Sequence, residues 1–137
     1  MFIRVPAIAY WPGKIAGGVT TDETAMSMDL FATMTELAKA RLPDGLALDG
    51  VSLTPVLLSD QALPQRTLFW QHKNLKAVRK AAWKLVVDED RIYLYNVEKD
   101  LAESVNCADR YPSTVKELMA ELNAWQKDIS SDAEKIS

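Results

Sequence analysis

Cysteine and histidine are almost absent from this chain, which holds one of each in 137 residues. A single Cys107 excludes an internal disulfide framework and a zinc site built from cysteines. His72 is the lone histidine, and nothing in the sequence pairs it with a nucleophile and an orienting acid. The sequence therefore predicts no catalytic residue and no metal ligand in this chain.

Long apolar runs and an excess of positive charge are also lacking. No run approaches the roughly 20 apolar residues that a membrane-spanning helix needs. Pro6 and Pro12 interrupt the apolar stretch near the start, which argues against a signal peptide and leaves the compartment undetermined. A formal net charge of -3 argues against a nucleic-acid surface. One basic cluster alternates with apolar residues and predicts a solvated sheet face; its members are Lys73, Lys76, Arg79, Lys80 and Lys84.

The first half of the chain shows one apolar segment and one helical period. Arg4 to Trp11 is apolar and predicts a strand that ends at Pro12-Gly13. A helix is predicted from about Ser27 to the turn at Pro43-Asp44-Gly45, followed by a short helical turn after Pro55. The expected buried stripe of the longer helix consists of Leu30, Phe31, Met34, Leu37 and Ala38.

From Arg66 to Val97 the hydrophobic period changes to two. Four strands are predicted, at Thr67–His72, Lys76–Arg79, Trp83–Val87 and Ile92–Asn96. The short connections between them imply antiparallel hairpins. The last helix, with a capping box at Thr114 and Glu117, is expected to cover one face of this sheet. Its apolar stripe consists of Val115, Leu118, Met119, Leu122, Trp125 and Ile129.

These patterns predict two folded parts and a tail. Residues 66–129 make a self-consistent subdomain of four antiparallel strands and one helix, and residues 130–137 are expected to form a flexible tail. Residues 1–60 supply a strand, a helix and a loop with no obvious sheet to join. Because a strand leaves backbone groups unpaired on both sides, this part is expected to continue a larger α/β domain. Taken alone, the chain is of the α+β class.

Several other features have ordinary structural explanations. Asp29 lies near a helix start, where an acid favours the helix dipole more readily than it binds a metal. The run from Asp88 to Asp90 lacks the ligand spacing of a calcium loop and predicts a solvated turn. The tryptophans are expected to pack in the core; they are Trp11, Trp70, Trp83 and Trp125.

A series of short motifs follows in a fixed order along the chain. They are Arg4-Val-Pro-x-Ile-x-x-Trp-Pro-Gly-Lys14, Met28-Asp-Leu-x-x-Thr33, Asp49-Gly-Val-Ser-Leu53, Leu68-Phe-Trp-x-His72, Ala77-Val-Arg-x-x-x-Trp-Lys-Leu85, and Leu94-Tyr-Asn-Val-Glu-Lys-Asp100 followed by Asn106. Each motif is weak alone. In this order, from Arg4 to about Gln126, they resemble the C-terminal portion of the arylsulfatase family, in the alkaline-phosphatase-like superfamily.

The resemblance implies a fold and a reaction. Residues 1–60 would be the end of the large α/β domain, with a late strand of its mixed sheet, and residues 66–129 the small C-terminal subdomain. The family hydrolyses sulfate esters with a formylglycine, made from the first residue of a C-x-P-x-R or S-x-P-x-R motif, beside a Ca²⁺. Cys107 does not fit this motif, because Asp109 and Tyr111 stand where it has Pro and Arg.

The catalytic groups of the family lie upstream of the segment that this chain resembles. The chain is therefore expected to bind no Ca²⁺ and to contain no formylglycine, to be inactive alone, and to need a missing N-terminal catalytic portion as its partner. The resemblance places His72, Lys73 and Asn74 near the substrate mouth of an intact enzyme, as part of the pocket rim. A surface or packing role for His72 is the alternative.

Two other functions stay open from the sequence. The chain could be a stand-alone, non-catalytic α+β interaction module that keeps a sulfatase-derived fold. It could also be the tail of a phosphate or phosphonate ester hydrolase, because the superfamily shares this architecture. The family resembled here is often exported, whereas the sequence predicts no signal peptide.

Overall fold

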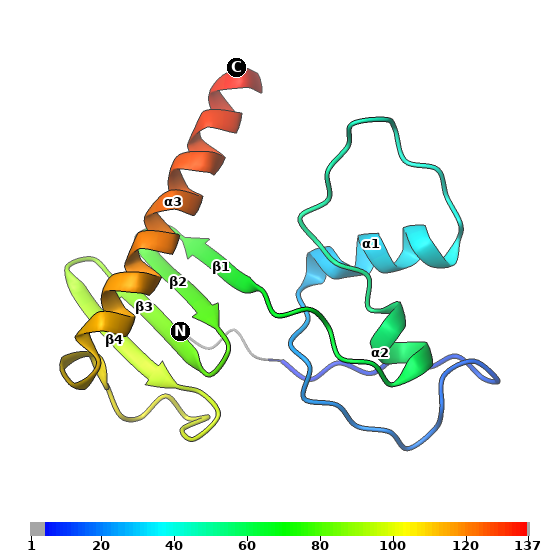
Figure 1. The fold of residues 1–137 in the computed structure, drawn as a ribbon, viewed down its shortest axis with the longest axis horizontal. Helices are drawn as coiled ribbons and strands as arrows, with labels where there is room; N and C mark the ends of the chain where they lie inside the picture. Colours follow the sequence, from blue (N-terminus) through cyan, green and yellow to red (C-terminus); the bar gives the residue numbers. More distant parts are fainter. Residues whose placement is uncertain (1–4, 137) are drawn as a thin grey trace. The chain divides into compact units, whose positions relative to one another are not determined.

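The computed structural model describes residues 5–136, with side chains described as far as Ser131. The chain divides into two compact units, one ending at Pro64 and the other beginning at Gln65. Each unit has its own elements, which Figure 1 labels. Arg4, where the first predicted strand begins, lies outside the described residues.

The second unit contains a four-stranded antiparallel sheet in which neighbours in sequence are neighbours in space (Figure 1). Its strands are β1 (Thr67–His72), β2 (Leu75–Lys80), β3 (Trp83–Asp88) and β4 (Arg91–Asn96). Each predicted strand is confirmed, and so are the antiparallel hairpins. The period-two pattern located this sheet because the meander needs only short-range pairing between consecutive strands.

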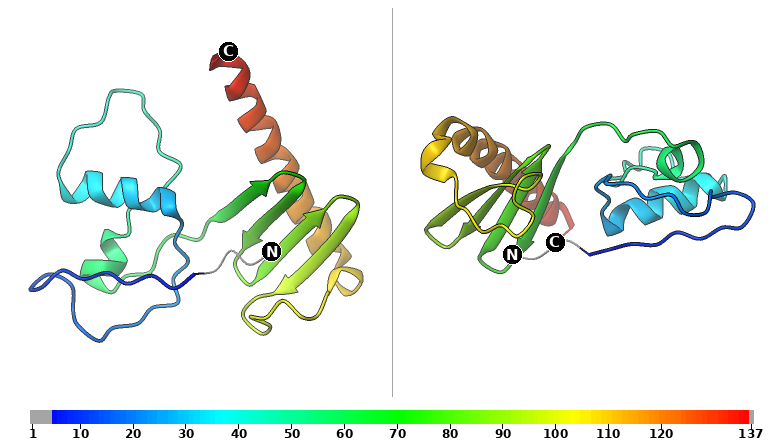
Figure 2. Two further views of the ribbon diagram at one scale, coloured as in Figure 1. Left: turned by 180° about the vertical axis from the view of Figure 1, so that it is seen from behind. Right: turned by 90° about the horizontal axis from the view of Figure 1, so that it is seen from below.

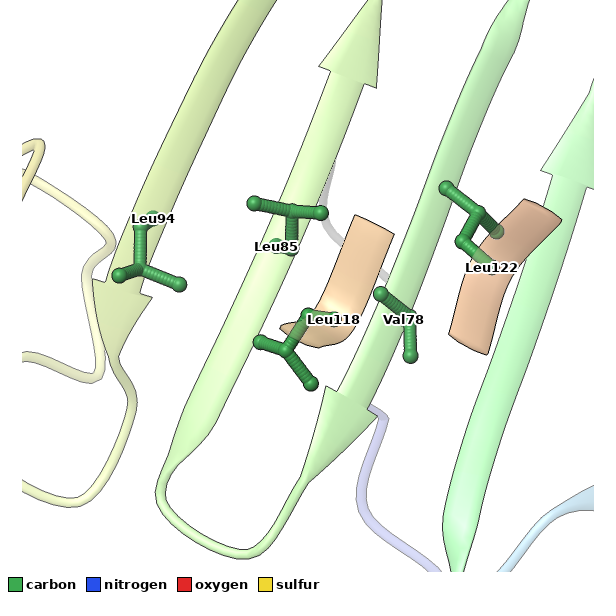
Figure 3. Packing of buried hydrophobic residues seen from close by; sticks show 5 residues of the cluster. All are labelled: Val78, Leu85, Leu94, Leu118 and Leu122. Carbon is green, nitrogen blue, oxygen red and sulfur yellow. The ribbon is translucent and has the colours of Figure 1, made fainter. Parts of the chain in front are cut away.

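Helix α3 (Pro112–Ile136) covers one face of this sheet. The helix stands in front of the sheet in Figure 1 and behind it in the reverse view of Figure 2. Figure 3 shows the core between these two layers, formed by Val78, Leu85, Leu94, Leu118 and Leu122, each no more than 2% exposed. Around this core, Phe69 stacks on Trp125 at 5.1 Å between ring centroids, and Trp83 packs against Tyr111 at 4.7 Å.

Both ends of α3 differ from the sequence expectation. The helix begins at Pro112, so Thr114 and Glu117 lie inside the first turns instead of forming a capping box. Proline suits a first helical position because its missing N–H would have no helical acceptor. At the other end, the helix continues to Ile136 through the segment expected to be a flexible tail. The hydroxyls of Ser130 and Ser131 each donate a hydrogen bond of 2.8 Å to carbonyls one turn earlier, which supports this continuation.

Polar side chains fasten the edge of the sheet to α3. Lys80 Nζ lies 2.7 Å from a carboxylate oxygen of Glu117 and 2.7 Å from one of Glu121. Thr67 Oγ1 donates to the other oxygen of Glu121 at 2.8 Å, and Lys76 Nζ donates to Gln126 at 3.2 Å. The hydrogen bonds with Glu117 and Glu121 raise the pKa of Lys80, and the bond from Lys80 lowers the pKa of Glu121.

The predicted solvated basic face is wrong for several members of the cluster. Lys76 and Lys80 point toward α3, whereas Lys84 lies on the opposite face and is only 2% exposed. The Lys84 ammonium forms an ion pair with Glu103, whose side chain is 15% exposed. Alternation along a strand shows which residues share a face, but it does not show whether that face is covered.

The first unit contains two helices, α1 (Ser27–Leu37) and α2 (Thr54–Ser59). Both predicted helical segments are confirmed, and Pro55 lies in the first turn of α2. The predicted strand from Arg4 to Trp11 is wrong: residues 5–11 form no strand. A strand is stable only when its backbone pairs with a neighbour, and the described part of this unit contains no strand to pair with it.

A group of hydrogen bonds, here called the Asp29 clamp, joins α1 to residues 49–53. The Asp29 carboxylate accepts from the Val51 N–H at 2.9 Å and from the Met26 N–H at 2.6 Å. Thr33 Oγ1 accepts from the Leu53 N–H at 2.8 Å and donates to the Asp29 carbonyl at 2.6 Å. Asp29 and Thr33 are 0% and 2% exposed, so α1 turns a polar side toward its own unit.

The predicted buried stripe of α1 is therefore wrong in this unit. Leu30, Phe31 and Met34 are 53%, 58% and 61% exposed. The 3.6-residue period located the helix correctly. The side of α1 that carries Asp29 and Thr33 faces residues 49–53, so the apolar stripe cannot face them as well. Because the polar side faces the unit, these three apolar side chains point away from it.

Replacing Glu103 by Gln should remove the carboxylate that pairs with the buried Lys84 ammonium. We expect Glu103→Gln to lower the free energy of unfolding by about 3 kcal/mol, because the buried Lys84 ammonium loses the carboxylate of its ion pair. Urea unfolding of the full chain, followed by tryptophan fluorescence, measures this loss. The double variant Lys84→Met/Glu103→Leu should recover most of it, and exposed Glu98→Gln should change little. A loss below about 1 kcal/mol for Glu103→Gln would contradict the burial of this pair.

Replacing Glu121 by Gln should change the acid side of the stability profile. The folded state lowers the Glu121 pKa below its ordinary value of 4.5, so the carboxylate stabilises the fold above that pH. This stabilisation is lost as the pH falls through the lower folded value. The advantage of wild type over Glu121→Gln should therefore be full at pH 6 and shrink steadily below pH 4.5 in urea unfolding. Asp128→Asn, an exposed change on the same helix, should give no such pH-dependent difference.

Candidate functional site

The candidate rim residues lie at the tip of the β1–β2 hairpin. His72 ends β1, Lys73 and Asn74 form the turn, and Leu75 begins β2. Lys73 adopts a left-handed backbone conformation with φ of 54°, which closes this tight turn. All three candidate residues are exposed. The structure thus brings His72, Lys73 and Asn74 together, as any hairpin tip must.

The same end of the sheet also carries the acidic β3–β4 turn. Cross-strand pairing places His72 opposite Leu75, Leu75 opposite Asp88, and Asp88 opposite Arg91. Residues paired in this way project from the same face of a sheet. His72, Asp88 and Arg91 therefore share one face, the one opposite α3.

This arrangement suits the binding of polar groups better than proton transfer. Lys73 and Arg91 are cationic donors, Asn74 is a neutral donor and acceptor, and all are exposed. Asp88, Glu89 and Asp90 are exposed as well, as expected for a solvated turn. Among the described residues, no three His, Cys, Asp or Glu side chains gather as metal ligands would.

Aromatic side chains occupy the same face one row further from the turns. Trp70 and Tyr93 belong to the row that also contains Ala77 and Val86, which are 0% and 4% exposed. The Tyr93 and Tyr95 rings stack with their centroids 6.3 Å apart. Burial, followed by the nearby Glu103 carboxylate, raises the pKa of Tyr95. The row of Trp70, Ala77, Val86 and Tyr93 is therefore largely buried. It lies next to the row that contains the exposed His72, Asp88 and Arg91.

The four tryptophans differ in where they lie and in how far they are buried. Trp83 and Trp125 pack against the core, as predicted. Trp70 lies on the other face of the sheet and is half-buried. Trp11 is 42% exposed, so the expectation of core packing is wrong for this residue.

Cys107 lies in a structural loop. Its N–H donates to the Leu94 carbonyl at 2.7 Å, and its Sγ approaches the Val105 carbonyl at 3.5 Å. The neighbouring Asn106 side chain accepts from the N–H groups of Leu94 and Ala108, at 2.9 and 3.0 Å. These hydrogen bonds hold the loop against β4. They give residues 106–108 a structural role.

A shallow hollow of about 390 Å³ opens beside this loop. Its lining residues are Ile92, Asn106, Ala108, Asp109, Pro112 and Val115. The one ionisable side chain in this lining is that of Asp109. No second acid, base or nucleophile stands beside it in the lining, so we assign no reaction to the hollow.

Sequence reasoning missed the structural importance of two residues in the first unit. Asp29 was expected to favour a helix dipole, but its carboxylate also fastens the Val51 backbone. Thr33 was noted only as the end of a motif, although its hydroxyl also accepts from the Leu53 N–H on the same side of α1. The spacing of Asp29 and Thr33 by four residues places both on one helix side, which was the available signal.

No helix among the described residues combines the length and the apolar character that crossing a bilayer requires.

Comparison with known proteins gives a consistent picture. Residues 1–128 match the family model described as "N-sulphoglucosamine sulphohydrolase, C-terminal". Arylsulfatase A of Bos taurus is 44% identical over 88 residues, which is 60% of this chain and 17% of the relative. Arylsulfatase A of Homo sapiens is 48% identical over 68 residues, covering 50% of this chain and 13% of the relative. The N-acetylgalactosamine-6-sulfatase of Mus musculus is 35% identical over 82 residues, covering 60% and 16%.

Solved structures share the fold. A structure titled "Ps i-CgsB" matches 85% of this chain and 27% of its own with a TM-score of 0.72 at 22% identity. A structure described as a 2-O GAG sulfatase matches 80% of this chain and 26% of its own, with a TM-score of 0.56 at 24% identity. The chain spans at most 17% of the length of the three curated relatives named above.

Proposed function

The chain belongs to the sulfatases, in the N-sulphoglucosamine sulphohydrolase C-terminal family, and we propose that it is the C-terminal portion of an arylsulfatase-like sulfuric ester hydrolase. The observation that carries this proposal is the family match, which extends over residues 1–128. Identities of 44% and 48% to arylsulfatase A support the arylsulfatase-like character. The sulfate-ester substrate is proposed on the same similarity.

The residues present do not fit the cofactors of the family. The described residues contain no group of three His, Cys, Asp or Glu side chains suited to Ca²⁺. The Cys107 sulfur approaches a loop carbonyl, and neither Pro nor Arg stands at the positions that formylglycine formation requires. No reaction step is therefore assigned to this chain, and Ca²⁺ and formylglycine are proposed for a catalytic portion.

That catalytic portion is the proposed partner of this chain. We assign residues 1–60 to the end of its large α/β domain and residues 66–129 to a small C-terminal subdomain, whose last helix continues to Ile136. The exposed apolar side chains of the first unit support this division, since Val5, Ile8 and Tyr10 are 79%, 96% and 85% exposed. Side chains of this kind are usually buried in a complete domain.

The proposed contribution of the second unit is scaffold together with part of the substrate-pocket rim. The proposed rim residues are His72, Lys73 and Asn74. Their side chains are exposed hydrogen-bond donors at one end of the sheet. A sulfate ester carries a negative charge, which the Lys73 ammonium attracts without taking part in bond cleavage. A rim of this kind changes substrate binding more than the rate of the chemical step.

The isolated chain should not hydrolyse a sulfate ester. We expect purified residues 1–137, supplied with Ca²⁺ and 4-nitrophenyl sulfate, to release no nitrophenol above the uncatalysed rate. A joined protein, in which the portion of bovine arylsulfatase A before its match precedes the full chain, should release it. Turnover by the isolated chain, free of contaminating enzyme, would overturn the proposal.

Removing the rim side chains should weaken substrate binding in the joined protein. We expect His72→Ala and Lys73→Ala each to raise KM for a bulky aryl sulfate about threefold to tenfold, with kcat within about twofold. A group that contacts ground state and transition state equally has this kinetic signature. Glu89→Ala, an exposed change in the adjacent turn, is the matched control and should not raise KM. Unchanged KM in both rim variants would assign His72 to an ordinary surface role.

A further inference from the structure

The two edges of the four-stranded sheet differ in how their backbone groups are paired. At the β4 edge, the Asn106 side chain accepts from the Leu94 N–H at 2.9 Å and donates to the Ile92 carbonyl at 3.2 Å. The Cys107 N–H donates to the Leu94 carbonyl at 2.7 Å. The loop that follows β4 therefore covers the outer backbone of that strand and closes this edge to a further strand.

The β1 edge is open. A two-residue turn joins β1 to β2, so the last pair before the turn, His72 with Leu75, exchanges hydrogen bonds. Bonded and non-bonded pairs alternate along an antiparallel ladder, so every second residue of β1 points its N–H and C=O groups outward. These residues are Thr67, Phe69 and Gln71. Among the described residues, no backbone group from elsewhere in the chain bonds to these outward groups.

Strand β1 also lacks the features that usually protect an edge strand. Natural edge strands carry charges or proline, or are interrupted by bulges. The segment Thr67–His72 reads Thr-Leu-Phe-Trp-Gln-His, with no Asp, Glu, Lys, Arg, Pro or Gly. Its pairing with β2 runs through every residue without a bulge. A regular, uncharged strand rich in aromatic residues favours pairing with another strand.

The side chains of this edge are held in place by α3. The Phe69 ring stacks on Trp125, with the ring planes 6° apart, and the Gln126 amide donates to Gln71 at 3.0 Å. Because α3 already fixes these side chains, a strand added beside β1 meets a preorganised edge. Little additional conformational entropy is then lost on association.

Helix α3 continues past β1, the last strand on that side of the sheet (Figure 1). Leu118 and Leu122 pack in the core over the sheet, and Trp125 packs over β1. Ile129 follows Trp125 on the same side of the helix and is 40% exposed. A fifth strand beside β1 would lie beneath Ile129. The open backbone edge and the uncovered helix side thus border the same place.

We propose that the β1 edge is a dimer interface, at which a second copy of this chain pairs its own β1 antiparallel to the first. A two-fold axis at Phe69 sets this residue opposite its own copy and Thr67 opposite Gln71. On the other face of the sheet, Leu68 lies opposite Trp70, an aliphatic–aromatic pair of the kind that stabilises sheets. The outward groups then exchange about six backbone hydrogen bonds. The same rotation keeps both α3 helices on one face, where each helix end covers the β1 of the other copy.

A second copy fits this edge because the edge is its own complement. Each outward N–H and C=O group meets the same set of groups on the other copy, and neither strand brings a charge. The contact is about 20 Å long and two layers deep, with about 10 Å between the layers. It is smaller than the standard interface of about 800 Å² on each partner, so we expect a weak dimer with a Kd of roughly 10–100 µM. The inference does not depend on the proposed reaction, because it uses only the contacts of the second unit.

Sedimentation equilibrium of the full chain between about 1 and 500 µM tests the association, and amide hydrogen exchange identifies the surface. The N–H groups of Phe69 and Gln71 should exchange at least about threefold more slowly at the highest concentration than at the lowest. The Trp70 N–H, which already faces β2, should show no such dependence.

Two substitutions disturb the two parts of the interface separately. Gln71→Pro removes an outward N–H, a change that an edge strand tolerates. Ile129→Glu places a charge on the helix end that covers the other copy. We expect each to weaken dimerisation at least about tenfold. The matched controls are Gln71→Ala, which keeps the N–H, and Val105→Glu, which adds the same charge to a 62% exposed side chain of the loop after β4. Both controls should dimerise like wild type.

Three results would overturn the inference. One is a wild-type chain that stays monomeric at about 500 µM, well above the expected Kd. Another is a dimer that persists in both Gln71→Pro and Ile129→Glu, which would place the contact on a different surface. The third is a dimer whose formation leaves the exchange of the Phe69 N–H unchanged. Circular dichroism checks that each variant is folded; if Gln71→Pro is not, Ile129→Glu and the exchange rates decide.

Discussion

The two-residue period of β3 is the constraint on which the second unit depends. Leu85 must face α3 to complete the core with Leu118 and Leu122, and this orientation sends Lys84 to the opposite face. That face is also covered at its centre, so the Lys84 ammonium is buried and needs the Glu103 carboxylate. A single register thus decides both the apolar core and the position of a buried charge. The polar loop that carries Glu103 is consequently part of the fold.

The first unit is organised by polar contacts instead of an apolar core. Asp29 and Thr33 bind backbone N–H groups of residues 51 and 53, and both side chains are buried. Hydrogen bonds of this kind fix geometry strongly while adding modest net stability. The unit therefore holds α1 in a definite orientation without burying the helix. This combination is expected for a segment whose remaining stability comes from a surface in another part of a larger domain.

The parts of the fold that depend on local pattern were predictable from the sequence. Consecutive strands such as Thr67–His72 and Trp83–Asp88 were located by alternation, because each pairs with its immediate neighbour in the chain. The burial of Lys84 was not predictable, because alternation says nothing about what covers a face. The outward direction of Phe31 was missed for a similar reason, since a stripe shows which side is apolar and not what lies against it. The strand expected at residues 5–11 requires a partner, and no local pattern supplies one.

The arrangement of rows on the sheet indicates how a scaffold can also vary a binding surface. The exposed row containing His72 and Arg91 is separated from the row containing Lys84 by an intermediate row with Ala77 and Val86 at its centre. Changes at the turns therefore do not alter the packing of Leu85 or the Lys84–Glu103 pair. Under the proposed function, this separation lets the rim change with the substrate while the sheet and α3 stay constant. The hairpin tips tolerate such change because their side chains are exposed.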